Sequence, residues 1–211
     1  MPTSIGDLFR AAGLGIAGIA RYGSSVKERW PGVYVIANTS NLGVSTQQRF
    51  EPSLSMDSIR EWARRVPTMQ LGDSAPPLTP EAVEARLLEF RLPDEPVLYI
   101  GKAGTAVPSR RSIGDRVADL YDHILGDPRP HRGGHWMKIL DDLDQKFVIW
   151  AVVTDGRSPE DVENEMLAHF VFGVSPASKA ALRDPLHPFP WANLEYPKGN
   201  RKKHGILNQT L

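Results

Sequence analysis

Apolar residues gather in three short stretches that have the composition of buried β-strands. Residues 32–38, 97–101 and 147–153 are rich in β-branched and aromatic side chains and are apolar on both faces. Helical and turn segments separate these stretches without regular alternation. The pattern therefore predicts an α+β fold built on a small sheet.

Other segments carry apolar residues at helical spacing. Residues 56–66, 112–125 and 159–172 show this spacing, and a shorter helix is expected over 136–143. Thr79 followed by Pro80 is a favourable N-cap and first helical position, which predicts a helix that ends before residue 92. The apolar run 11–20 is shorter than the ~20 residues that span a bilayer. We interpret it as a packing helix with an irregular tail over 13–20, and expect no membrane association.

Length and charge narrow the possible partners. A chain of 211 residues with 41% hydrophobic content is expected to form one domain with one good core. The formal net charge is zero, so a nucleic-acid site has to be a local basic patch. The absence of cysteine excludes disulfides and thiolate metal sites and fits a cytoplasmic protein.

Glu163 is the most unusual candidate for chemistry. On its predicted helix it shares the apolar face of Val162, Met166 and Phe170, whereas Glu160, Asp161 and Glu165 are expected to point elsewhere. A carboxylate that faces the core is costly unless a cation or a donor meets it. A metal ion and an ion pair with a nearby arginine are both open explanations.

Three further residue types could act on a phosphate. Arg116 borders the apolar stripe of its helix, where it is either a phosphate-binding fork or a surface arginine. Tyr34 and Tyr99 lie in the middle of strands, where they are either core residues or, beside a metal and Lys102, groups that help to activate water. Asn193, in a proline-flanked stretch, could hold a bend or a water.

Basic residues gather in two segments. The first contains two glycines, an aromatic residue and the candidate phosphate ligands Arg129, His131 and Arg132. Zinc binding by His131 and His135 is disfavoured, because no third ligand is obvious. The second is a basic C-terminal extension over 184–211, in which Arg201, Lys202 and Lys203 would suit a DNA backbone or form a solvated tail.

The ordered set Gly32-Val33-Tyr34, Tyr99-Ile100-Gly101, Arg116, Glu163 and Asn193 resembles the GIY-YIG nuclease superfamily. The resemblance spans roughly residues 31–193. It implies a three-stranded antiparallel sheet flanked by helices, and cleavage of DNA phosphodiester bonds with one Mg²⁺ or Mn²⁺ ion. Residues 39–96 then form a helical insertion between the first two strands, within a single domain over 1–211.

The resemblance also implies roles for individual residues. Glu163 would bind the metal, Tyr34 would act as or position the general base, and Tyr99 and Lys102 would support that phenol and the phosphate. Arg116 would stabilise the transition state. Asn193 would brace the site, and Asn200 is the alternative for this role. Many family members carry a His or Tyr one helical turn after the arginine, and Tyr121 would take the place of that residue.

Three functions follow as hypotheses. The first is a metal-dependent DNA endonuclease, for which a homodimer would explain double-strand cleavage. The second is a nucleic-acid-binding module on the same fold without turnover. The third is a structural or protein-interaction domain that uses the insertion 39–96 as its working surface.

Overall fold

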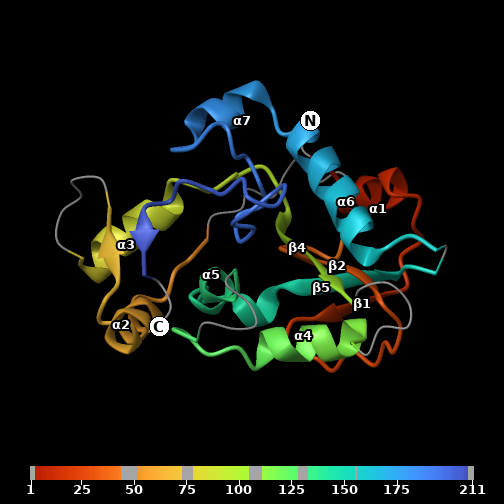
Figure 1. Ribbon diagram of the computed structural model, residues 1–211, viewed down its shortest axis with the longest axis horizontal. Coiled ribbons are helices and arrows are strands. Elements are labelled where there is room, and N and C mark those ends of the chain that lie inside the picture. The colour runs from red at the N-terminus through yellow and green to blue at the C-terminus, as the bar shows by residue number, and fades with distance from the viewer. Residues whose placement is uncertain are drawn as a thin grey trace.

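A four-stranded antiparallel sheet lies at the centre of the protein, in the strand order β1-β5-β2-β4 (Figure 1). The computed structural model describes residues 3–43, 52–72, 78–104, 111–127, 133–154 and 156–208. The strands of the central sheet are β1 (Gly18–Arg21), β2 (Gly32–Ala37), β4 (Val97–Ala103) and β5 (Phe147–Val152). The predicted α+β class and the three predicted strands are confirmed, and β2 is buried at every position, as its continuous apolar run predicts.

The sheet has one strand more than the sequence predicted. The run 11–20 is not a helix with an irregular tail: α1 (Ile5–Ala11) ends where the run begins, and β1 pairs with β5 from Gly18 opposite Trp150 to Arg21 opposite Phe147. A Cβ atom on Gly18 would lie 2.2 Å from the Trp150 ring, so glycine is what allows the pairing. This strand contains few β-branched residues, which is why the sequence pattern did not predict it.

Helices cover both faces of the sheet. On one face, α1 and α6 (Pro159–Gly173) pack on a core that includes Val33, Val35 and Ile100; on the other, α4 (Ile113–Tyr121) packs on Tyr34 and Ile36 (Figure 1). The helix α6 has nearly its predicted extent, whereas α4 ends four residues before residue 125. The helix expected over 136–143 is the shorter α5 (Gly134–Lys138).

The predicted insertion contains the two expected helices, α2 (Met56–Arg65) and α3 (Pro80–Leu88). Thr79 caps α3 by accepting a hydrogen bond from the Ala82 N–H at 3.1 Å, as predicted. Trp62 and Leu87 join the same core cluster as Tyr34, so the insertion extends the core. A second sheet, which the sequence did not reveal, pairs β3 (Gln70–Leu71) with β6 (Ile206–Leu207).

The C-terminal segment continues around the sheet. After the short helix α7 (Pro176–Ala181), it follows the free edge of β4, where the Ala192 N–H donates to the Leu98 carbonyl at 2.8 Å. An exposed edge strand is thereby covered. In the part of the chain that the structure describes, no helix has the length and apolar character needed to cross a bilayer.

Candidate functional site

Tyr34 and Tyr99 come together on neighbouring strands, β2 and β4. The antiparallel register sets Tyr34 opposite Gly101 and Ile36 opposite Tyr99, so both phenols lie on the face of the sheet that α4 covers. Their ring centroids are 6.0 Å apart. Tyr34 is completely buried, and its hydroxyl has no hydrogen-bond partner among the described residues. A buried hydroxyl without a partner is costly, so a water or a ligand oxygen would stabilise it.

Gly101 makes room for this tyrosine pair. A Cβ atom at this position would lie 2.6 Å from the Tyr99 ring and 2.8 Å from the Tyr34 hydroxyl. The glycine therefore lets both rings lie directly over the backbone of β4.

We expect Gly101→Ala to displace the phenols and to lower the free energy of unfolding by about 1–3 kcal/mol, because the added methyl overpacks the site. Thermal unfolding measures the change. Gly15→Ala is the control, since nothing lies within 4 Å of a Cβ there. Equal melting temperatures for Gly101→Ala and the parent would contradict the packing described here.

Arg116 and Glu163 approach the phenols from opposite faces of the sheet. Arg116 lies on α4 and Glu163 on α6, yet both act electrostatically on Tyr34 and on Tyr99, and Arg116 also acts on Glu163. The structure thus brings together four of the predicted residues: Tyr34, Tyr99, Arg116 and Glu163.

Burial sets the protonation of this group. It raises the pKa of Glu163 to about 7, with Lys102 and Arg116 opposing the shift and Glu160 adding to it. Burial also raises the pKa of Tyr99 to about 12, and that of Tyr34 well above its ordinary value, with the Tyr99 phenol and the Glu163 charge adding to the shift. The environment favours neutral phenols, so it suits Tyr34 to positioning a water more than to acting as a phenolate base.

Lys102 joins the group through the carboxylates. Its Nζ atom lies 3.6 Å from Glu163 Oε2 and 3.0 Å from Glu160 Oε1. The expectation that Glu160 points away from the site was therefore wrong. Its position one helical turn before Glu163 was the signal that would have placed both carboxylates on the same side of α6.

The donor set fits a metal ion that is shared with a substrate. Among the described residues, no three His, Cys, Asp or Glu side chains gather closely enough to hold a metal ion. Mg²⁺, however, is usually bound through one or two carboxylates together with waters and substrate phosphates. Glu163, with Glu160 beside it, supplies that number of carboxylates.

Asn193 lies behind the tyrosines, on the free edge of β4. Its Oδ1 atom accepts from the Ile100 N–H at 2.9 Å, and its Nδ2 atom donates to the Ile100 carbonyl at 2.8 Å. It therefore fixes the residue between Tyr99 and Gly101. Asn200, the alternative, belongs to another network, in which its Oδ1 atom lies 2.5 Å from His187 Nε2.

The structure does not bring Tyr121 into the group around Tyr34. Its ring contacts Tyr22 instead, with centroids 4.6 Å apart. Tyr121 follows Arg116 by five residues, so the two side chains leave α4 in directions about 140° apart. The proposed role for Tyr121 as a substitute in the site lacks support from this geometry.

The basic residues predicted to contact DNA have different environments. Arg201 and Lys203 are exposed, and Arg201 pairs with Glu195 at 3.4 Å. For Lys202 the prediction was wrong, because its buried ammonium donates to the carbonyls of Pro190 and Trp191 at 2.7 and 2.8 Å. The residues Arg129, His131 and Arg132 lie outside the described residues.

His135 is a core residue. It is fully buried and stacks on Trp62, and its Nδ1 atom lies 3.0 Å from His123 Nε2. Burial lowers the pKa of His135 to about 3, which keeps the ring neutral. These contacts make His135 part of the core.

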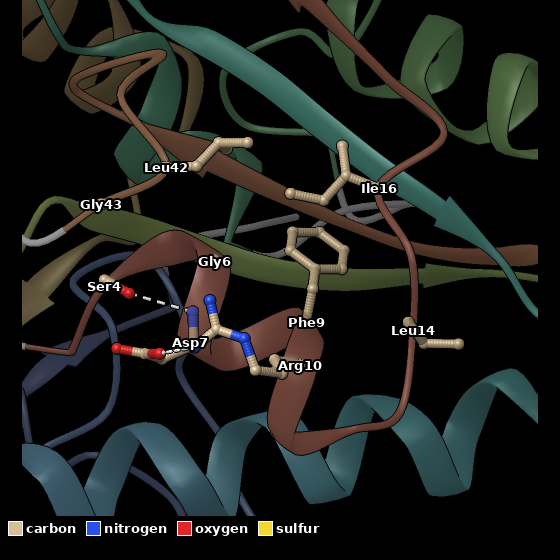
Figure 2. Close-up of a pocket in the computed structure, with 9 residues that line it drawn as sticks. All are labelled: Ser4, Gly6, Asp7, Phe9, Arg10, Leu14, Ile16, Leu42 and Gly43. Atoms are coloured by element: carbon tan, nitrogen blue, oxygen red, sulfur yellow. Dashed lines mark hydrogen bonds and ion pairs between the residues drawn. The ribbon is translucent and has the colours of Figure 1, made fainter.

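A pocket of about 520 Å³ lies elsewhere, beside α1 (Figure 2). Phe9, Leu14, Ile16 and Leu42 supply its apolar surface. Its polar side chains bond to one another or to α1: Ser4 Oγ accepts from the Asp7 N–H, and Asp7 pairs with Arg10. The pocket contains none of the candidate residues, so we do not assign the chemistry to it.

Comparison of the chain with protein-family models, with curated proteins and with solved structures finds no match.

Proposed function

We propose that this protein is a metal-dependent endonuclease that hydrolyses DNA phosphodiester bonds. The observation that carries the proposal is that a partly buried carboxylate from α6 and a guanidinium from α4 both act electrostatically on the buried phenol of Tyr34 and the partly buried phenol of Tyr99. The same carboxylate lies 3.6 Å from the Lys102 ammonium on β4. The resemblance of the ordered residue set to GIY-YIG nucleases supports the same activity.

Each residue has a role that its surroundings allow. Glu163, once ionised, would hold Mg²⁺ or Mn²⁺, and that ion would polarise the phosphoryl group and the leaving oxygen. Lys102 stabilises the ionised form of Glu163 and keeps an ammonium close to the incoming phosphate. Arg116 provides a planar donor fork for the charge that develops on the phosphate.

The phenols orient the attacking water. The Tyr34 hydroxyl is buried beside the Tyr99 phenol, where it can accept a hydrogen bond from a water or donate one to a phosphate oxygen. Tyr99 lies beside it and limits its movement. Asn193 is a positioning residue, because it acts through the backbone of β4.

We expect nicking of supercoiled plasmid in Mg²⁺ or Mn²⁺ and none in EDTA. Arg116→Lys keeps the charge but loses the planar fork, and should slow cleavage about 100-fold. Arg60→Lys is the matched control, since Arg60 is exposed on α2 and forms a local ion pair with Asp57 at 2.8 Å. DNA binding by the parent without cleavage in any divalent metal would instead support the inactive binding module.

A further inference from the structure

Trp30 is a large aromatic side chain that the fold holds in solvent. It is 62% exposed, although it lies only two residues before the first residue of the fully buried strand β2. Its backbone is fixed on both sides: its N–H donates to the Glu28 carboxylate at 3.2 Å, and its carbonyl accepts from the Ile113 N–H at 3.0 Å. The ring is thus presented from a rigid position, which lowers the entropy cost of a contact with a ligand.

This position lies next to the candidate site. Tyr34 follows Trp30 by four residues of nearly extended chain, which corresponds to roughly 13 Å. Ile113, which bonds to the Trp30 carbonyl, is the first residue of α4, and Arg116 lies less than one helical turn beyond it. A nucleic-acid strand that passes the site would therefore meet Trp30 within a few nucleotides of the scissile phosphate.

The charges around Trp30 favour a polyanion. Lys27 and Arg29 are exposed and form no ion pair with any residue that the structure describes. Arg111, just before α4, is also exposed, although it pairs with Asp119 at 3.0 Å. The Glu28 carboxylate accepts from the backbone N–H groups of Arg29 and Trp30, so part of its charge is engaged locally.

We propose that Trp30 stacks on an unpaired base of the DNA substrate while Lys27 and Arg29 contact the adjoining phosphates. Aromatic rings flanked by cations are the usual means of binding single-stranded nucleic acid, because every base has a face on which to stack. The inference rests on the proposed function for the identity of the neighbouring site. It adds a substrate class: DNA with a single-stranded or unpaired segment beside the cleavage position.

The test measures the affinity of the full chain for a fluorescein-labelled single strand and for the matched duplex, both in EDTA. We expect Trp30→Ala to weaken single-strand binding about 5- to 100-fold, and Trp30→Phe to restore most of it. Duplex binding should change by less than about threefold, because paired bases are not free to stack. Phe172→Ala is the control: Phe172 is 85% exposed, but on α6.

Two results would overturn the inference: equal affinity of Trp30→Ala and the parent for the single strand, or equal losses for the two DNA forms. Absence of DNA binding by the parent would overturn both proposals. Trp30-dependent binding without cleavage in any metal would contradict the proposed endonuclease activity and would still support the Trp30 binding site. Metal-dependent cleavage of DNA that is bound equally well without Trp30 would support the endonuclease activity and contradict the Trp30 binding site.

Discussion

Glu163→Gln is expected to slow Mg²⁺-dependent cleavage by at least about 100-fold while DNA binding in EDTA stays near that of the parent. The amide has nearly the size of the carboxylate but carries no charge for a metal ion. Rates of plasmid nicking and fluorescence anisotropy with labelled DNA measure the two effects. Retained cleavage by Glu163→Gln would eliminate Glu163 as the metal ligand.

Glu160→Gln is the matched control on the same helix. Glu160 pairs with Lys102 at 3.0 Å, but its side chain is 58% exposed, compared with 18% for Glu163. Exposed ion pairs contribute little energy, so we expect cleavage to change by less than about tenfold. A loss equal to that of Glu163→Gln would mean that both carboxylates hold the metal.

The raised pKa of Glu163 also predicts how cleavage depends on pH. The free protein holds the Glu163 proton up to about pH 7, and a metal ion has to displace it. The cleavage rate at low Mg²⁺ should therefore fall about tenfold for each pH unit below 7. Higher Mg²⁺ concentrations should shift this decline to lower pH, because metal and proton compete for the same carboxylate.

The same shift sets a stability cost. The unfolded chain releases the Glu163 proton near 4.5 and the folded protein only near 7, so stability is lost as the pH rises between these values. At pH 8 the Glu163→Gln variant should consequently unfold at a temperature no lower than the parent. Lower activity with undiminished stability would distinguish the loss of a site carboxylate from damage to the fold.

The sequence revealed those parts of the fold in which local signals and burial agree. The strand β2 is apolar at nearly every position and buried throughout, and Thr79 with Pro80 marks the start of α3. The strand β1 was missed because its pairing depends on Gly18 fitting against Trp150, far along the chain. The β3–β6 sheet is likewise two residues long on each side and leaves no periodic signal.

The site was predictable from the sequence where a charged residue falls on the apolar face of a predicted helix. Glu163 interrupts an apolar stripe, and this conflict indicated a carboxylate that is partly buried in the structure, with a pKa that burial raises. Lys202 gave no such signal: within a basic run it looks solvated, and only the folded chain shows the carbonyls of Pro190 and Trp191 around its ammonium. Contacts of this kind depend on tertiary packing, which one-dimensional patterns do not contain.

Asn193→Ala is expected to lower the free energy of unfolding by about 2–4 kcal/mol, the largest stability loss among these variants. The substitution leaves both the N–H and the carbonyl of Ile100 without their partner on the covered edge of β4, and each buried unpaired group costs about 1–3 kcal/mol. Denaturant unfolding measures the loss. Asn193→Asp keeps an acceptor for the Ile100 N–H but removes the donor to its carbonyl, so its loss should be intermediate.

Cleavage at a temperature where the variants remain folded separates positioning from stability. Ile100 lies between Tyr99 and Gly101, so a loosened edge of β4 should displace the phenols and slow cleavage by Asn193→Ala even when the protein is folded. Asn200→Ala is the control, because Asn200 bonds to His187 and to the Tyr196 carbonyl and acts on another segment. We expect it to reduce stability without slowing cleavage by the folded protein. Equal cleavage by folded Asn193→Ala and the parent would show that Asn193 only stabilises the edge strand and does not position the site.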